Sequence, residues 1–305
     1  MQQHALVVGE ALVDVVHTAD GAVREHPGGS AANVAVALAR LGRRVRFASA
    51  YADDAYGRLI ADHLAADGVE PGSDPAVVAR TSSATATIGP DGAASYVFDL
   101  DWRLGEVALD PAPVAVHVCS LGAVVEPGAA QVADLLARAR ELAVISYDIN
   151  ARPAVTGVGA DTVASVERVA ALAHLVKASD EDLQALYPEL GVDGAAAHLL
   201  GLGPYAVVVT RGGEGATWYA PSGRVDVVSR PVEVADTIGA GDTFGAALLD
   251  GLWDAGLLVA GAPWAVAPAL GEARITALLT HAACAAAVTV SRPGADPPYR
   301  SELEA

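Results

Sequence analysis

Lysine and cysteine are scarce in this 305-residue chain, and each shortage excludes a class of site. Lys177 is the single lysine among 19 lysine and arginine residues. A nucleotide-binding loop of the type G-x-x-x-x-G-K-[ST] needs a lysine directly after a glycine, so the chain has no such loop. The two cysteines, Cys119 and Cys284, are too few for a disulfide framework and indicate a reducing compartment.

Positive charge is also scarce. The formal net charge is −18, which argues against nonspecific binding to nucleic acid or to an anionic membrane. The N-terminus runs from Met-Gln-Gln-His directly into Ala-Leu-Val-Val, without the basic segment of a signal peptide. The most apolar C-terminal stretch, about 275–290, is shorter than the ~20 residues of a membrane span. We therefore expect a cytoplasmic protein that binds neither nucleic acid nor membranes.

Aromatic residues make up 5% of the chain, although 52% of it is hydrophobic, so small aliphatic side chains must fill the interior. Short β-branched runs alternate with Ala/Leu-rich stretches, a pattern typical of a parallel sheet covered by helices on both faces. Strands are predicted at 5–8, 45–48, 114–118, 143–147, 174–177 and 206–210. Helices are predicted at 30–41, 56–66, 129–140, 161–171, 181–186, 241–253 and 273–287. The length allows one large α/β domain or two smaller ones.

Two segments, about 12–23 and 76–100, interrupt this rhythm, because they look like strands with no helix between them. The second contains Pro90-Asp91-Gly92, which is typical of a hairpin turn. Together they predict a small antiparallel flap, or lid, over the main sheet. The alternative is a pair of surface hairpins without a function.

The most specific functional signal is the segment 236–245, Asp-Thr-Ile-Gly-Ala-Gly-Asp-Thr-Phe-Gly, which opens an apolar helix. Helix N-termini present unpaired backbone N–H groups and the positive end of the helix dipole, so they bind phosphate. Gly239 and Gly241 let the backbone approach an anion closely. The carboxylate of Asp242 would repel that anion. Its simplest role is therefore that of a base, which takes a proton from an alcohol while the turn holds the phosphoryl group.

Polar residues also follow the first predicted strand. Asp14 lies where the chain emerges from this strand, and a carboxylate there can accept hydrogen bonds from two adjacent hydroxyls of a sugar. A turn aspartate is the alternative. Gly28 and Gly29 precede Ser30, which is expected to cap the next helix. Asn33 in its first turn is a poor helix former, and its amide can donate to and accept from a hydroxylated ligand.

A further polar group follows the strand predicted at 143–147. Asp148, Asn150 and Arg152 alternate along the chain, so in an extended segment they would face one way at the end of a strand. Ligands bind at the carboxyl ends of such strands, and Arg152 could hold a phosphate or carboxylate there.

Two later segments carry weaker signals. Ser179 or Asp180 can cap the helix that follows Lys177; a metal-linked role through water is the alternative to simple capping. The segment Thr210 to Gly215 is a glycine-rich turn after a buried strand, which suits a nucleotide. Because no helix follows these glycines, the turn is not a dinucleotide fingerprint.

In this order and spacing, the segments resemble the ribokinase-like, or PfkB, family of carbohydrate kinases across essentially the whole chain. The motif from Asp236 to Phe244 is highly specific, and Gly28-Gly29 with Asn33 supports it. Gly9-Glu10, Asp148-x-Asn150-x-Arg152 and Lys177-x-Ser179-Asp180 are most similar to fructokinases. The resemblance implies a three-layer α/β/α sandwich with a mainly parallel sheet, a single domain 1–305 with a β lid, and phosphorylation of a sugar primary hydroxyl by ATP.

The resemblance also implies roles for individual positions. Asp242 is the base, and the amides of Gly239, Ala240 and Gly241 form the anion hole. The implied sugar-binding residues are Asp14, Gly28, Gly29, Asn33, Phe98, Asp148, Asn150 and Arg152. The implied nucleotide-binding residues are Lys177, Ser179, Thr210, Gly212 and Gly215, with His281 and Cys284 in the helix that lines the adenine pocket.

Metal ions and a second subunit complete the expectations. Family members organise Mg²⁺ with an Asn-x-x-Glu motif, which corresponds here to Ser179 and Asp182, with Glu181 as the alternative carboxylate. Asp236, the Ile238 carbonyl and the loop through Gly294 lie where some members bind a monovalent cation such as K⁺. An exposed strand edge of the lid could pair with a second copy, giving a homodimer.

Three competing readings remain. The substrate could be 2-keto-3-deoxygluconate or a nucleoside rather than fructose, although a nucleoside favours an aromatic platform and the chain has three Phe. The chain could be a sugar-binding sensor on a kinase fold, against which Asp242 argues. An NAD-dependent oxidoreductase would need a strand–glycine–helix fingerprint that the sequence lacks.

Overall fold

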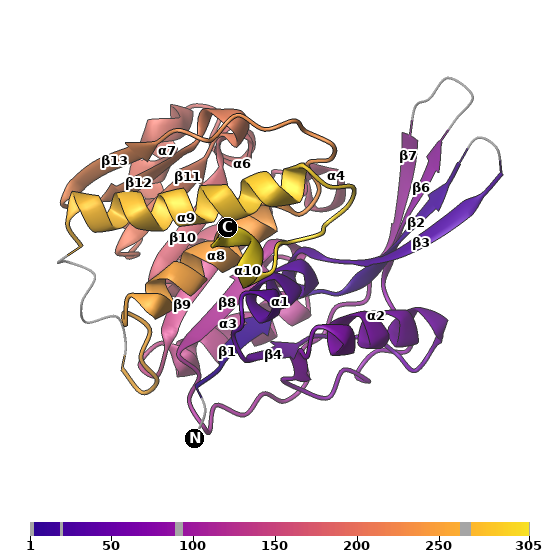
Figure 1. The fold of residues 1–305 in the computed structure, drawn as a ribbon. Helices are drawn as coiled ribbons and strands as arrows, with labels where there is room; N and C mark the ends of the chain where they lie inside the picture. Colours follow the sequence, from indigo (N-terminus) through magenta and orange to yellow (C-terminus); the bar gives the residue numbers. More distant parts are fainter. Residues whose placement is uncertain (1–2, 19–20, 89–93, 263–269, 305) are drawn as a thin grey trace.

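A nine-stranded sheet forms the centre of the molecule (Figure 1). The structure, a computed structural model, describes residues 3–18, 21–88, 94–262 and 270–304. The strands of this sheet are β1 (Ala5–Val8), β4 (Val45–Ala48), β5 (Glu70–Pro71), β8 (Ala115–Cys119), β9 (Val144–Asp148), β10 (Leu175–Ser179), β11 (Ala206–Thr210), β12 (Ala216–Ala220) and β13 (Gly223–Val227). Their order is β13-β12-β11-β10-β9-β8-β1-β4-β5. Only the pairings β11–β12 and β12–β13 are antiparallel, so the sheet is mainly parallel, as predicted.

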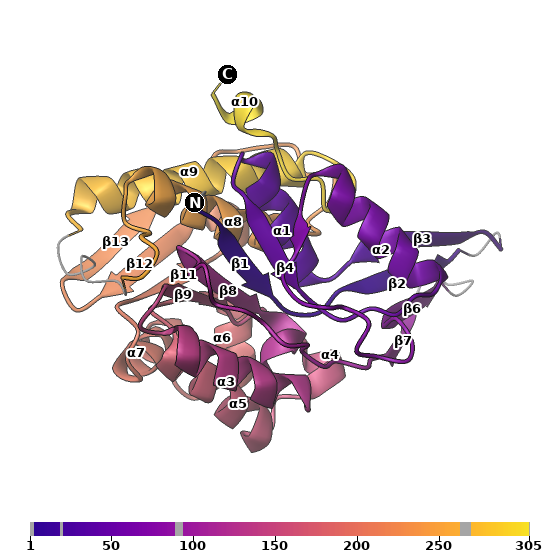
Figure 2. The ribbon, with the colours of Figure 1, turned by 90° about the horizontal axis from the view of Figure 1, so that it is seen from below.

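Helices cover both faces of the sheet (Figure 2). One layer contains α1 (Ser30–Arg40), α2 (Ala55–Ala66), α8 (Ala240–Asp254) and α9 (Glu272–Val290). The other contains α3 (Gly128–Ala139), α5 (Ala160–Leu172), α6 (Asp180–Leu186) and α7 (Gly191–Gly201). Each layer packs on the sheet through its own cluster of buried Val, Leu, Ile and Ala side chains. This arrangement confirms the three-layer α/β/α fold.

Some elements lie outside the predicted ones. They include α7, strand β13, two short helices, α4 (Pro153–Thr156) and α10 (Arg300–Leu303), and two 3₁₀ turns, Ser120–Ala123 and Gly212–Glu214. Helix α7 begins at Gly191 with a φ of +63° and has no side-chain cap. Because glycine is a poor helix former and no capping residue marks the start, the sequence carried no helix signal there.

A second sheet extends away from the first and forms the flap (Figure 1). Its strands are β2 (Leu12–His17), β3 (Val23–Gly28), β6 (Ser83–Ile88) and β7 (Ala94–Asp99), in the order β3-β2-β6-β7. The expectation of a purely antiparallel flap was wrong, because β2 and β6 pair in parallel. Strand β3 lies almost entirely beyond the predicted segment 12–23. The prediction ended too early because the polar sequence of β3, Val-Arg-Glu-His-Pro-Gly, lacks the apolar alternation that indicates a strand. The predicted turn Pro90-Asp91-Gly92 lies outside the described residues.

The register of the flap aligns three side chains on one face. Asp14 on β2 stands opposite Ala84 on β6, and Ala84 stands opposite Phe98 on β7. Cross-strand neighbours in register lie on the same face of a sheet. Since β1 leads through residues 9–11 directly into β2, the central sheet fixes where this face begins.

Helix α9 is the one described helix long and apolar enough to span a membrane by length and composition. It lies against α8, and its residues Ile275, Leu279 and Ala282 are buried in the core. Contact with α8 is close, because a Cβ on Gly251 would lie 2.9 Å from Leu278 Cδ2. The stretch expected to be too short for a span is thus part of a longer helix, and because one face of that helix packs against α8 and the sheet, we interpret α9 as an element of this fold.

The flap is anchored to the α/β core by Asp54, the N-cap of α2. Its carboxylate accepts hydrogen bonds from the N–H of Gly57 at 2.7 Å and from the N–H and hydroxyl of Thr81 at 2.9 and 2.7 Å. We expect Asp54→Ala to lower the free energy of unfolding by about 1–2 kcal/mol, because the cap and the Thr81 contacts are lost together. Urea unfolding measures this.

The matched control is Asp53→Ala. The Asp53 side chain is 91% exposed and pairs only with Arg58 among the described residues. Such a surface pair contributes little, so this variant should unfold like the wild type. Equal losses in both variants would contradict the anchoring role of Asp54.

Candidate active site

Two helices begin at one buried carboxylate, that of Asp242. Ser30 in the first turn of α1 donates its hydroxyl to Asp242 Oδ1 at 2.6 Å. Asn33, one turn later, donates its amide to Oδ2 at 2.8 Å. Asp242 itself lies in the first turn of α8 and is 5% exposed. The first turn of α1 thus directs two side-chain donors at the acid that lies in the first turn of α8.

Ser30 does not cap α1, contrary to expectation. The N-cap is Gly29, whose φ of +104° favours glycine, and Ser30 is the first helical residue. Its hydroxyl is therefore available to Asp242. Glycine is also required at position 29 because a Cβ there would lie 2.7 Å from the Glu10 carbonyl oxygen.

A cavity of about 320 Å³ opens beside Asp242 at the carboxyl ends of the strands. The flap face contributes Asp14, Ala84 and Phe98. The predicted sugar-binding residues in its wall are Asp14, Gly29, Asn33, Phe98, Asn150 and Arg152. Gly28 is not in the wall, but a Cβ there would lie 2.4 Å from Asp14 Oδ2, so this glycine makes room for the Asp14 carboxylate.

A second cavity, of about 230 Å³, lies on the other side of the 237–241 turn. The predicted nucleotide residues Thr210, Gly212 and Gly215 line it, together with a wall of small residues from α9: Ala283, Ala286, Ala287 and Val290. Thr237 and Gly241 line both cavities, Ala240 lines the second, and Gly239 and Asp242 line the first. The motif turn is therefore the partition between two pockets.

His281 and Cys284 do not line this second cavity, which corrects the predicted adenine contacts. Each residue of a helix is turned about 100° from the next, so the face that carries Ala283 and Ala287 excludes them. His281 instead contacts Asp250 of α8, with Nε2 2.9 Å from Oδ2.

Asp148 and Lys177 form a buried ion pair beneath the turn, with Nζ 2.7 Å from Oδ2. Asp148 lines neither cavity, so the expected alignment with Asn150 and Arg152 was wrong. Asp148 is the last residue of β9, and Asn150 has a φ of +39°, which breaks the alternation of an extended chain. Lys177 Nζ lies 3.4 Å from where a Cβ on Gly241 would stand. The only lysine of the chain is thus held directly under the partition.

Burial and the partner's charge shift the pKa of each residue of this ion pair in opposite directions. Burial raises the pKa of Asp148 to about 6, although the charge of Lys177 opposes the shift. The ammonium of Lys177 is favoured despite burial, because Asp148 raises the pKa of Lys177 above its ordinary value.

The two predicted metal-binding carboxylates are already engaged by backbone N–H groups. Asp182 forms a capping box with Ser179, and its Oδ1 accepts from the N–H of Ala151 at 2.8 Å. Asp236 accepts from Ile238 at 3.0 Å and from Gly294 at 2.9 Å. Across residues 3–18, 21–88, 94–262 and 270–304, no group of three or more His, Cys, Asp or Glu could hold a metal ion.

Sequence reasoning assigned no role to Glu10, which lines the first cavity and is 5% exposed. Its Oε2 accepts from the N–H of Gly122 at 2.8 Å, between residues far apart in the sequence. The Gly9-Glu10 pair after the first strand was the only available signal. Ser120 and Leu121 also line this cavity without having been predicted.

A sequence profile of the pfkB family carbohydrate kinases matches residues 2–302. The chain therefore belongs to the pfkB family and is a sugar kinase. A fructokinase of Rhizobium leguminosarum bv. trifolii is 34% identical to it over 258 residues, which are 81% of this chain and 79% of the relative.

Solved structures agree with this assignment. The fructokinase of Xylella fastidiosa with bound ATP matches with a TM-score of 0.85 at 26% identity, covering 100% of this chain and 98% of that one. A Vibrio cholerae O395 fructokinase variant with fructose, ADP and potassium ion matches with a TM-score of 0.80 at 27% identity, covering 99% and 97%. The fold is thus that of the ribokinase-like sugar kinases.

Glu10 gives the site a testable pH dependence. Burial raises the pKa of Glu10 from 4.5 to about 7, and the charge of Asp242 adds to this, while the Gly122 N–H and Arg152 oppose it. Because the folded state favours the protonated form, the contribution of Glu10 to stability is full below pH 4.5 and is lost as pH rises through about 7.

We therefore expect the wild type to lose stability relative to Glu10→Gln between about pH 5 and about pH 8, by on the order of 3 kcal/mol. The glutamine keeps an acceptor for Gly122 and does not titrate. Urea unfolding of both proteins across this pH range measures the difference, and parallel stability curves would rule the burial effect out.

Proposed function

We propose that this sugar kinase transfers the γ-phosphoryl group of ATP to a primary hydroxyl of fructose, with Asp242 as the base. The observation that carries the proposal is the 237–242 turn, which separates the two cavities and contributes residues to both. A phosphoryl group bound at this turn has a nucleotide site on one side and a carboxylate-bearing site on the other. Relatives named fructokinase support fructose as the substrate.

The second cavity is proposed to hold ATP. The glycines at 212, 213 and 215 let the backbone approach phosphate or ribose, and the alanine wall of α9 offers a flat apolar surface to a purine ring. Bound ATP in the Xylella structure supports this assignment. Lys177 under the partition would add positive charge near the transferred group, in line with its predicted nucleotide role.

The first turn of α8 is proposed as the anion hole. Helix geometry leaves the first N–H groups of α8 without intrahelical partners, and the helix dipole favours negative charge there. Gly239, with a φ of +75°, forms the turn before the helix, and the N–H of Ala240 already donates to the Thr237 carbonyl at 3.3 Å. Charge that develops on the transferred phosphoryl group is stabilised most by donors fixed in advance.

Asp242 acts in the proposed mechanism by accepting one proton. The sugar hydroxyl donates a hydrogen bond to a carboxylate oxygen of Asp242, and its own oxygen attacks the γ-phosphorus. The bond from that phosphorus to the ADP oxygen breaks, and the hydroxyl proton passes to Asp242. Ser30 and Asn33 hold the carboxylate in one orientation, so most of the rate comes from positioning.

The first cavity offers the chemistry that a sugar requires. Asp14 presents a carboxylate to adjacent hydroxyls, Arg152 a guanidinium and Asn150 an amide, while Phe98 provides an apolar face. Phe98 is the one aromatic residue in the described wall, which disfavours a nucleoside. The acid 2-keto-3-deoxygluconate remains the second candidate because Arg152 could pair with its carboxylate.

Magnesium is expected to enter with the nucleotide. Mg²⁺ keeps several waters and takes one or two carboxylates plus substrate phosphates, so it needs no complete protein cage. The buried Oδ1 of Asp148 has no hydrogen-bond partner, whereas both oxygens of Asp182 have one. Asp148 therefore keeps a free acceptor that the predicted Asp182 lacks, but this oxygen lies beneath the turn and lines neither cavity, so a Mg²⁺-bound water would have to enter below the turn to reach it.

A monovalent cation is also proposed, at Asp236 and the Gly294 loop. The potassium ion in the Vibrio structure supports it. In this chain Asp236 accepts from the backbone N–H groups of Ile238 and Gly294, which holds the two loops together, and loop carbonyls are the kind of ligand that K⁺ takes.

The flap is proposed to act as a lid and a dimer contact. Val23 and Val97 are 52% and 68% exposed, and β3 and β7 are edge strands that can pair with a second copy. A solution measurement by sedimentation that finds only monomer would contradict the dimer.

We also propose that the enzyme is cytoplasmic.

The substrate assignment predicts ADP release with fructose above that with ribose or 2-keto-3-deoxygluconate. Asp242→Asn should keep the fold and the thermal shift with sugar, and should lower kcat by about two to four orders of magnitude because the base is lost. Coupled ADP release measures both.

Asp254→Asn, at the other end of α8, is the matched control and should retain wild-type kcat. Near-normal turnover in Asp242→Asn would overturn the role of Asp242. Higher turnover of another sugar would overturn only the choice of fructose.

If the flap closes over the sugar, Phe98 should affect sugar binding and the exclusion of water, and the neighbouring Val97 should not. Phe98 faces the first cavity, whereas Val97 lies on the opposite face of β7. Phe98→Ala should raise the KM for fructose about tenfold and increase ADP release without sugar, since water is excluded less well. Val97→Ala should match the wild type in KM for fructose and in ADP release without sugar; an effect of Val97 on the proposed dimer is measured separately by sedimentation. Unchanged KM and unchanged ATP hydrolysis in Phe98→Ala would refute the lid.

A further inference from the structure

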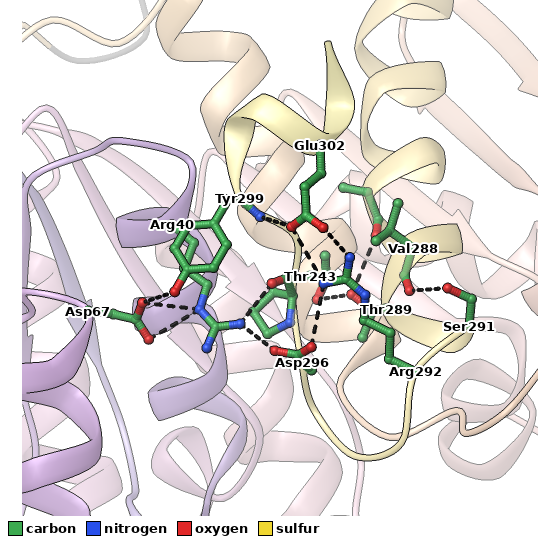
Figure 3. Close-up of polar contacts among 12 residues, drawn as sticks. Arg40, Asp67, Thr243, Val288, Thr289, Ser291, Arg292, Asp296, Tyr299 and Glu302 are labelled. Carbon is green, nitrogen blue, oxygen red and sulfur yellow. Dashed lines mark hydrogen bonds and ion pairs between the residues drawn. The ribbon is translucent and has the colours of Figure 1, made fainter. Parts of the chain in front are cut away.

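The C-terminal segment 291–303 lies across α1 and the end of α9, next to the motif turn (Figures 1 and 3). Two contacts join it to that turn. The N–H of Gly294 donates to Asp236 Oδ2 at 2.9 Å, and a Cβ on Gly239 would lie 2.7 Å from the Cβ of Ala295. Ala295 thus packs directly on the glycine that precedes the proposed anion hole.

The next residue, Asp296, ties this segment to α1. Its carboxylate pairs with Arg40, whose guanidinium also donates to the Pro297 carbonyl at 2.9 Å and to Asp67 at 3.1 Å (Figure 3). The Arg40 side chain is only 14% exposed, and its two carboxylate partners, Asp67 and Asp296, are 9% and 46% exposed. Half-buried, multiply bonded Arg–carboxylate pairs hold geometry far better than exposed ones.

Three more interactions hold the same region. Arg292 pairs with Glu302 and, at 3.4 Å, with Asp296, both within the segment (Figure 3). Thr289 at the end of α9 donates to Thr243 at 2.9 Å, in a buried contact one residue after Asp242. The segment is therefore tied internally and to α1, and the helix that leads into it is tied to α8.

Helix α1 connects this network to the catalytic carboxylate. Its first turn carries Ser30 and Asn33, which bond Asp242, and its last residue is Arg40. Ten residues of helix span about 15 Å, so Arg40 cannot touch a substrate bound at Asp242. Any effect of the Arg40–Asp296 pair on the reaction must pass through the position of the turn.

We propose that Asp296 and Arg40 are positioning residues, whose ion pair presses Ala295 against Gly239 and holds the anion-hole amides in their reactive arrangement. Donors fixed in advance are what stabilise a transferring phosphoryl group, and small displacements reduce the rate strongly. This inference rests on the proposed function, because it concerns the turn proposed to hold that group.

The test compares Asp296→Ala, Asp296→Asn and Asp254→Ala at constant K⁺ and Mg²⁺. Asp296→Asn keeps an oxygen that can accept from Arg40. Asp254 is the control for general anchoring of the segment: it is 55% exposed against 46% for Asp296, and it pairs with Arg43 and with Arg300. Arg300 lies at the far end of the same segment and keeps its pair with Asp250 when Asp254 is removed, so Ala295 stays in place.

Asp296→Ala should lower kcat about tenfold with sugar KM within about twofold of the wild type. It should also weaken binding of ADP with aluminium fluoride and sugar, a mimic of the transferring phosphoryl group, without weakening binding of ADP alone. Asp296→Asn should recover much of the loss, and Asp254→Ala should behave as wild type.

A second readout does not require activity. Hydrogen–deuterium exchange of the amides in 236–241 should be faster in Asp296→Ala than in the wild type and in Asp254→Ala. Unchanged exchange, or equal effects of Asp296→Ala and Asp254→Ala, would overturn the inference. A wild type that phosphorylates no sugar overturns the proposed function instead, while faster exchange would still establish that Asp296 holds the turn.

Discussion

The hydrogen bonds from Ser30 and Asn33 to Asp242 are the contacts on which the site depends. They join residues 212 and 209 positions apart and bring the first turns of α1 and α8 together. A buried carboxylate is stable only where donors surround it, so these bonds also favour the docking of the two helices in this register. One carboxylate thereby fixes the first cavity, which α1 and the flap line, relative to the second cavity, which α8 and α9 line.

Small residues make this convergence possible. Gly28 leaves space for Asp14, Gly239 for Ala295 and Gly251 for Leu278. In each case a Cβ on the glycine would lie too close to the neighbouring side chain. The alanines of α9 likewise let it lie close to α8 while they form the wall of the second cavity. The low aromatic content has the same effect, because small side chains let helices approach closely. Closely packed helices place backbone N–H groups and short polar side chains within reach of a ligand.

Sequence reasoning located the parts of the site that local backbone geometry determines. Asp242 could be assigned because glycines before a helix define its surroundings within a few residues. The contacts of His281 could not be assigned, because an error of one position along a helix turns the side chain by about 100° toward a different neighbour. The predicted alignment of Asp148 with Asn150 and Arg152 was wrong for a similar reason, because the positive φ of Asn150 breaks the alternation of side chains along the chain. Glu10 depends on Gly122, a partner 112 residues away that no local pattern reveals.

Charge sets the remaining constraint on how the site can work. The chain carries a net charge of −18, and Glu10, Asp148 and Asp242 are all buried at or beneath the partition. Against these acids the described part of the site sets Lys177, itself paired with Asp148, Arg152 in the first cavity and Arg230 in the second. A polyphosphate that approaches a chain of this net charge meets long-range repulsion, which these few cations offset only in part. This balance of charge supports the proposals that the nucleotide enters with a metal ion and that the N-terminus of α8 stabilises the charge that moves during transfer.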